Sequence, residues 1–229
     1  PAYADIFSSS NKCGREVIFA VHQDVSEALN GPAYYLGWNE SYVEAAYRNN
    51  PVPTTGGNQW WWYTDTYRAL LQADPADTRA ALTCRTADYG TGGRRIGWTE
   101  KLMGRVDNGT RIFDSDFILY RYGEAFLMAA EARYYGKDYA GALEALAPLA
   151  ARAYGRRDYY TDTSPEAVLQ AIVDEYLREM VGEGRTWWML LRTDKIWEYS
   201  ADIAAQRDKN PNILLWPITQ AVSYTHLRA

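Results

Sequence analysis

Two helix-forming segments separated by only Gly136 and Lys137 leave the second half of the chain few possible folds. The first segment, 116–135, begins at Asp116, which can cap a helix. Its apolar residues recur at helical spacing, as do those of the second segment, 138–153. These residues are Ile118, Tyr122, Phe126 and Ala129 in the first segment and Leu143, Leu146 and Leu149 in the second. Because so few residues join the segments, the sequence predicts an antiparallel αα-hairpin.

Residues around the break resemble the middle of a tetratricopeptide unit, in which small side chains let two helices approach closely and a Tyr fills the gap. They are Gly136, Tyr139, Ala142 and Leu143. No second copy follows at a fixed period, so we expect one such unit and not an array.

A second pair of helices is expected further along the chain. Ser164 and Pro165 form a helix start, with Ser as the cap and Pro at the first helical position. This helix should run to Val181, where Gly182-Glu183-Gly184 ends it. The pattern of apolar residues then predicts another amphipathic helix over 185–197.

The first half of the chain is divided by turn signals between residues 30 and 109, so that helix can persist there only in pieces. One piece is expected from about Trp60 to Leu71, before Asp74-Pro75 stops it. Upstream of this region, the β-branched and aromatic run 16–21 predicts a strand or extended segment. The predicted fold is mainly α, with an irregular, aromatic-rich region carrying little strand.

Composition excludes several classes of function. The net charge of -5 and the pI near 5.2 give no reason to expect nucleic acid, which is held by clustered Lys and Arg. His22 and His226 have no metal-ligand spacing, and we predict no metal site, no cofactor and no catalytic residues. Cys13 and Cys84 leave a single disulfide open. No segment has the roughly 20 apolar residues of a membrane span.

The aromatic content, 14% with nine Trp and nineteen Tyr, favours a binding surface, because amphipathic rings suit sugars and protein partners alike. The best candidate for ligand contact is Asn58, Gln59, Trp60, Trp61, Trp62 and Tyr63. Aromatic rings stack on the C–H faces of sugars, while amides bond the hydroxyls. Consecutive rings on a helix cannot all point inward, so at least one should be exposed. The alternative is that two of the three Trp pack in the core. Asp65 and Arg68 could add polar contacts.

Glu175 and Glu179 could suggest catalysis, since they lie four residues apart on one helix face. A glycosidase needs two carboxylates facing each other across a sugar, which neighbours on one helix do not provide. We therefore expect these acids to form structural ion pairs, of the strength of partly exposed pairs, with Arg178, Arg185 and Arg192. Glu124 and Glu131 are interpreted in the same way, and Trp187 and Trp188 are expected in the core.

Four motifs follow one another along the chain: the extended Glu16-Val17-Ile18-Phe19, the stretch from Asp116 to Glu124 leading into Ala129-Ala130-Glu131-Ala132, the stretch from Glu175 to Arg185, and Trp216-Pro217-Ile218. In their order and spacing they resemble the SusD/RagB family of Bacteroidota. The chain departs from the family pattern at Tyr176, where Arg is usual, and at Trp188, where an acidic residue is common.

This resemblance implies a tetratricopeptide-like scaffold of SusD type and a lipid-anchored protein on the outer face of the outer membrane. Such a protein would bind oligosaccharide without catalysis and deliver it to a TonB-dependent, SusC-like transporter. The alternatives are a protein-interaction scaffold, a peptide-capturing subunit of the same kind of complex and, less favoured, a fragment of a glycoside hydrolase.

Family proteins are longer, so the resemblance also implies that the chain is an incomplete, carboxy-terminal part of one, without the leader, lipid-anchor cysteine and first helices. We expect a family-like region over 1–221, with the irregular ligand surface in 1–109 and the helical scaffold in 110–221. Residues 222–229 resemble the translation of a sequencing adapter and are expected to be a non-native tail.

Overall fold

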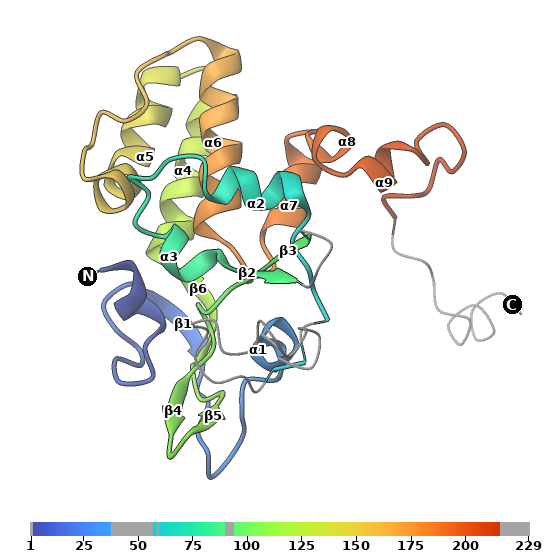
Figure 1. The fold of residues 1–229 in the computed structure, drawn as a ribbon. Coiled ribbons are helices and arrows are strands. Elements are labelled where there is room, and N and C mark those ends of the chain that lie inside the picture. The colour runs from blue at the N-terminus through green and yellow to red at the C-terminus, as the bar shows by residue number, and fades with distance from the viewer. Residues whose placement is uncertain (1, 38–56, 59, 90–93, 216–229) are drawn as a thin grey trace, which may run out of the picture. The chain divides into compact units, whose positions relative to one another are not determined.

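A computed structural model of the protein describes residues 2–37, 57–58, 60–89 and 94–215 (Figure 1). The chain divides into two compact units, residues 1–186 and residues 187–229. The expected division at 109–110 stays a prediction. The predicted tail at 222–229, the Trp216-Pro217-Ile218 motif and Gln59 lie outside the described residues.

Three long helices form the main scaffold of the first unit (Figure 1). They are α4 (Tyr122–Tyr135), α5 (Tyr139–Tyr154) and α6 (Pro165–Glu179). The predicted αα-hairpin is confirmed as α4 and α5, and α6 packs against both. Asp138 begins α5 by accepting a hydrogen bond from the backbone N–H of Gly141 at 2.9 Å, and Gly155 ends it with a left-handed φ of 74°.

The contact between these helices is made by small and branched apolar side chains. Alanine at the closest positions lets the helix backbones approach, while Leu, Val and Ile fill the remaining space. The fully buried residues are Leu127, Ala130, Ala142, Leu146, Ala150, Ala153, Val168, Ile172 and Val173.

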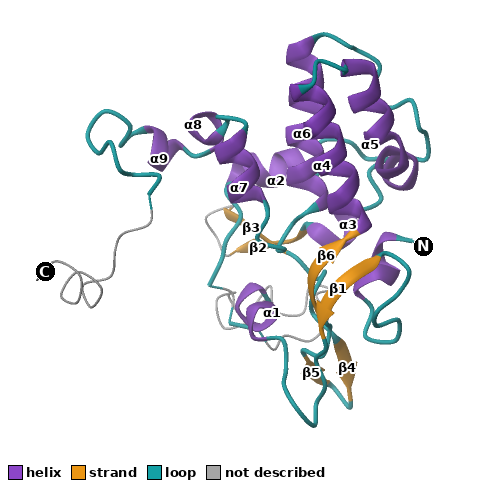
Figure 2. Ribbon diagram, turned by 180° about the vertical axis from the view of Figure 1, so that it is seen from behind, coloured by secondary structure: helices purple, strands orange, loops and turns teal. Residues whose placement is uncertain are grey.

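The segment before α4 is a strand, and the predicted helical start at Asp116 is wrong. β6 (Phe117–Arg121) pairs antiparallel with β1 (Val17–Val21), as Figure 2 shows. Asp116 accepts a hydrogen bond from the Gln23 N–H at 3.1 Å instead of capping a helix. The β-branched and aromatic residues of 117–120 suit a strand when a partner strand is present. The prediction of a strand at 16–21 is confirmed.

The remaining elements of the first unit are short. The helical ones are η1 (Tyr3–Phe7), α1 (Gly31–Leu36), α2 (Asp65–Leu71) and α3 (Ala80–Thr83). Two further two-stranded antiparallel sheets are formed by β2 (Arg85–Tyr89) with β3 (Arg94–Trp98) and by β4 (Arg105–Asp107) with β5 (Thr110–Ile112). A core below the long helices joins η1, α1 and β6 through Tyr3, Ile6, Phe7, Ala33, Leu102, Met103, Phe113 and Ile118.

Three short helices are found among residues 186–215, where the description of the chain ends, and the first two of them take the place of the single helix expected over 185–197. They are α7 (Thr186–Arg192), α8 (Ile196–Tyr199) and α9 (Ala201–Ala204). The break falls at Asp194, whose φ of 57° lies in the left-handed region and cannot continue an α-helix. The preceding helix also ends earlier than predicted, at Glu179 and not Val181. Trp187 is half-buried and Trp188 is 49% exposed, so the expectation of core packing is wrong for Trp188.

Candidate functional site

Residues 60–64 have no regular secondary structure, and the helix predicted from Trp60 begins only at Asp65. Thr64 marks the start of α2, because its side-chain oxygen accepts a hydrogen bond from the Tyr67 N–H at 3.2 Å. Residues 60–64 therefore precede the helix. Their side chains are therefore not distributed around a helix.

All three tryptophans lie on the surface. The exposed fraction is 62% for Trp60, 64% for Trp61 and 38% for Trp62. Indole side chains are usually highly buried, so three exposed in a row need an explanation other than folding. The alternative that two of the three pack in the core is wrong.

The segment is attached to α1 at its amino-terminal end. The Asn58 N–H donates to the Tyr34 carbonyl at 2.8 Å, and the Trp60 N–H donates to the Tyr35 carbonyl at 2.9 Å. Gly57 touches the end of α1 directly, since a Cβ added there would come within 2.3 Å of the Gly37 carbonyl carbon. Only glycine permits this close approach of two backbones.

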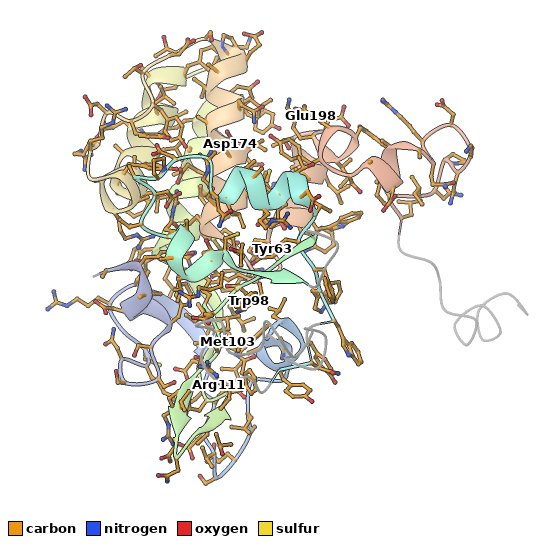
Figure 3. All side chains as sticks on the ribbon, in the orientation of Figure 1. Tyr63, Trp98, Met103, Arg111, Asp174 and Glu198 are labelled. Atoms are coloured by element: carbon orange, nitrogen blue, oxygen red, sulfur yellow. The ribbon has the colours of Figure 1, made fainter. Side chains whose placement is uncertain are left out.

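Tyr63 attaches the other end of the segment. Its ring lies between α2 and β3 (Figure 3), where a Cβ at Gly97 would come within 3.0 Å of it. Its hydroxyl donates to the Thr83 carbonyl at 2.7 Å, and its ring packs edge-on against Tyr67. Burial raises the pKa of the Tyr63 hydroxyl well above its ordinary value. Tyr63 therefore serves as an anchor, and the three exposed indoles are held between two fixed points.

The other predicted site residues have different surroundings. Asn58 is half-buried beside α1, and Gln59 lies outside the described residues. Asp65 and Arg68 form an ion pair with each other at 2.9 Å. No ligand is present to test whether any of the six residues binds one, so their role stays a prediction.

Two tyrosines of α1 join this surface and were missed in the sequence. Tyr34 is 41% exposed and Tyr35 is 37% exposed. The Tyr35 ring centroid lies 4.4 Å from that of Trp60. A signal was present, because Asn30 followed by Gly31-Pro32 is a helix start with Asn as the cap, whereas Gly31-Pro32 was interpreted only as a turn.

Glu175 and Glu179 form structural ion pairs, as predicted, but with other partners. Arg79 Nη1 lies 2.8 Å from Glu175 and 3.0 Å from Glu179. Arg121 Nη1 lies 2.6 Å from Glu179, and Arg121 Nε lies 2.7 Å from Glu183. The prediction that Arg178, Arg185 and Arg192 are the main partners of Glu175 and Glu179 is therefore wrong. Arg178 instead donates to the hydroxyl groups of Tyr154 and Tyr160. Arg185 forms an ion pair with Glu124 at 3.2 Å, which confirms the predicted ion-pair role of Glu124.

This network is buried and not partly exposed, which corrects the expected strength of its ion pairs. The side chains of Arg121, Glu175 and Glu179 have no exposed area. Although burial alone would raise the pKa of Glu179, the charges of Arg121, Arg152 and Arg79 hold it well below its ordinary value. Burial lowers the pKa of Lys101 to about 8, even though Glu183 lies against its ammonium group. Through Arg121, the network joins β6 to Glu16 just before β1, to α6 and to the turn after α6, and its carboxylates face guanidinium groups.

Glu175 and Glu179 cannot act as a glycosidase pair in this arrangement. Each is fully buried and bound by Arg79, so neither can reach a glycosidic oxygen. Glu175 also accepts hydrogen bonds from Tyr154 and Tyr160 at 2.6 and 2.8 Å.

The described residues contain neither a cluster of metal-binding side chains nor a disulfide bond. In these ranges, no three or more His, Cys, Asp or Glu side chains are grouped to hold a metal ion. Cys13 and Cys84 do not form a disulfide bond. None of the helices that the structure describes is both long and apolar enough to cross a membrane.

Comparison with known families identifies the scaffold. A model of the SusD family matches residues 98–222, which include α4, α5, α6 and much of the ion network. The chain belongs to the SusD family. The tryptophan segment lies before the matched residues. Comparison with curated proteins finds no match.

Solved SusD-family structures confirm the mainly α, tetratricopeptide-like fold. A SusD superfamily protein of Bacteroides fragilis superposes on 98% of the chain with a TM-score of 0.75 at 23% identity. NanU of the same species covers 100% of it with a TM-score of 0.68 at 22% identity. Surface glycan-binding protein A of Bacteroides thetaiotaomicron covers 86% with a TM-score of 0.59 at 19% identity. The chain spans 52%, 52% and 46% of these proteins, about half of their length.

Proposed function

We propose that this SusD-family chain binds oligosaccharide without catalysis and presents it for uptake. The complete protein would act on the outer face of the outer membrane, held by a lipid anchor, and would deliver the glycan to a TonB-dependent, SusC-like transporter. The observation that carries the proposal is the exposure of Trp60, Trp61 and Trp62 on a segment fixed at both ends.

This geometry suits a sugar ligand for physical reasons. Exposed indoles offer flat, electron-rich faces on which the C–H faces of a sugar ring can stack. The attachment to α1 and the anchoring of Tyr63 reduce the conformational entropy that the segment would otherwise lose on binding. Several rings close together would contact more than one sugar unit, which favours an oligosaccharide.

Family membership supports the same proposal. One of the similar structures is named as a surface glycan-binding protein, although at 19% identity the similarity to this chain concerns the fold alone. The burial of Glu175 and Glu179 against Arg79 supports binding without reaction.

A protein-interaction scaffold, or capture of a peptide, is the second candidate. It is favoured by exposed apolar side chains away from the tryptophan segment. On α4, Tyr122 is 53% exposed, Met128 is 55% exposed and Tyr135 is 55% exposed. Exposed apolar side chains of this size can contribute to protein contacts.

Affinity electrophoresis in gels containing amylopectin, xyloglucan, glucomannan, arabinoxylan, pectin or mucin glycans tests the proposal. The 229-residue chain is compared with the triple variant W60A/W61A/W62A and with the matched control Y122A/M128A/Y135A, which removes three exposed apolar side chains of α4. We expect at least one polysaccharide to retard the wild type and the α4 control but not the tryptophan variant. If nothing retards the wild type, or the tryptophan variant is retarded equally, the glycan proposal is wrong and the scaffold proposal is favoured.

A further inference from the structure

The rings of Tyr34 and Tyr35 in α1 meet the ring of Trp60 in the tryptophan segment. Tyr34 and Tyr35 have ring centroids 5.5 Å apart, with planes at 70°. Tyr35 and Trp60 have centroids 4.4 Å apart, with planes at only 36°, so the Trp60 indole lies partly face-on to the Tyr35 ring. All three side chains are nevertheless exposed. We call these three residues the aromatic corner.

The position of α1 in this corner is fixed by buried contacts. The Asn30 side chain accepts from the Ala33 N–H at 3.1 Å and donates to the Ser115 carbonyl at 3.1 Å. The Asn30 N–H donates to the Phe113 carbonyl at 2.8 Å. Tyr34 packs edge-on against Phe113. The tyrosines are therefore presented by a helix that is tied to the core, although it has fewer than two turns.

The Trp60 backbone is fixed to the same helix, but the backbone does not determine the side-chain rotamer. An indole outside a helix has several staggered χ1 positions, and exposure to water does not select one. Contact with Tyr35 does select one, because a tilted ring pair is more stable than two separated rings. Although it makes this contact, the Trp60 side chain remains 62% exposed.

We infer that Tyr35 is a positioning residue for glycan binding, which holds the Trp60 indole with its free face toward the sugar, and that Tyr34 extends the same surface. The inference rests on the proposed function, since it assigns a role within that site. A ring is required for the role and a hydroxyl is not, because the contact is made between ring faces.

The test uses four variants of the chain with the polysaccharides that retard the wild type. Y35A removes the contact and Y35F keeps it. G57A keeps every ring but places a Cβ against Gly37, so it separates the segment from α1. Y135A is the matched control, an exposed Tyr that contacts another ring, that of Tyr134. The thermal midpoint is measured for each, together with the ¹⁹F resonance of Trp60 in chain labelled with 5-fluorotryptophan, assigned by its loss in W60F.

We expect Y35A to weaken binding by roughly tenfold, which corresponds to the loss of one aromatic pair. Y35F and Y135A should bind within about twofold of the wild type. G57A should also bind more weakly. Y35A should shift the Trp60 resonance while leaving the thermal midpoint close to that of the wild type.

Two results overturn the inference. Unchanged affinity and an unchanged Trp60 resonance in Y35A would show that Tyr35 does not position the indole. Loss of binding in Y35F equal to that in Y35A would show that the hydroxyl contacts the ligand directly. These failures differ from failure of the proposed function, in which the wild type binds no polysaccharide. In that case the Trp60 resonance still tests the positioning.

Discussion

Arg121 illustrates how single residues hold this fold together. Its guanidinium has no exposed area and faces three carboxylates, from Glu16, Glu179 and Glu183. Removing one partner from a buried ion cluster leaves unpaired charge in a medium of low polarity, which is far more costly than losing an exposed pair. The stability of the scaffold should therefore be sensitive to this side chain.

Replacing Arg121 by Met should lower the free energy of unfolding by about 3–5 kcal/mol, measured by urea denaturation. The control is Arg157→Ala, because Arg157 pairs with Glu144 at 2.7 Å while both side chains are more than half exposed. That variant should lose less than about 1 kcal/mol. Equal losses in the two variants would mean that the network contributes no more than a surface pair.

The buried carboxylates also predict a dependence of stability on pH. The pKa values of Glu175, Glu179 and Glu183 are lowered in the folded state: burial opposes this, but neighbouring Arg and Lys charges outweigh it. The stabilisation is complete above the unfolded-state pKa, which is about 4.3 for Glu, and is lost as pH falls below it. The urea midpoint should therefore be nearly constant from about pH 6 to pH 5 and fall steeply toward pH 3. A constant midpoint down to pH 3 would contradict this account.

The sequence correctly indicated that Glu175 and Glu179 form structural ion pairs, but it did not indicate the right partners. Four-residue spacing on a helix was enough to interpret Glu175 and Glu179 as structural. Arg79 and Arg121 could not be identified as their partners, because 96 residues separate Arg79 from Glu175 and nothing local marks the contact. Pairing at such separation depends on the tertiary fold.

Elements with strong start and stop signals were predictable, whereas those that depend on a distant partner were not. Asp138 and Gly155 mark both ends of α5, and Pro165 marks the start of α6. Residues 117–120 have apolar side chains that fit either a continuing helix or a strand, and only pairing with Val17–Val21 decides between them. The tryptophan segment was assigned to a helix because its attachment to α1 was not visible in the sequence.

Helix capping gives a prediction at this scale. Asp138→Ala should destabilise the protein by about 1 kcal/mol, because the Asp138 side chain accepts a hydrogen bond at the start of α5. Ser164→Ala is the comparison, since Ser164 occupies the cap position of α6 without a side-chain cap hydrogen bond. Thermal denaturation should show a clearly smaller change for Ser164→Ala. A larger change for Ser164→Ala would reverse the assignment of the two caps.

The first unit as a whole combines a helical scaffold with an aromatic surface built from the short helix α1 and the tryptophan segment. SusD-family membership rests on residues 98–222, whereas the exposed aromatic residues of the candidate site come earlier in the chain, at Tyr34, Tyr35 and Trp60 to Trp62. The scaffold could therefore be recognised from the order of the motifs along the sequence. The site could be proposed only from its composition, and the share of α1 in it emerged from the structure.

Exposure of apolar side chains on α4 predicts self-association of the 229-residue chain. Tyr122, Met128 and Tyr135 are each more than half exposed, and water leaves such surfaces favourably when two copies meet. Analytical ultracentrifugation should show association that rises with concentration and is reduced in Met128→Glu, while Arg157→Glu leaves it unchanged. Association of the same extent in Met128→Glu would place the contact elsewhere.

The central claim, that glycan stacks on the exposed indoles, is tested most directly by oxidation of tryptophan with N-bromosuccinimide, read by mass spectrometry with and without a bound polysaccharide. Trp188, 49% exposed and outside the site, is the control within the same chain. We predict that glycan protects Trp60 and Trp61 and leaves the oxidation of Trp188 unchanged. Equal oxidation of Trp60 and Trp61 with and without bound glycan, or protection of Trp188 alone, would contradict the account.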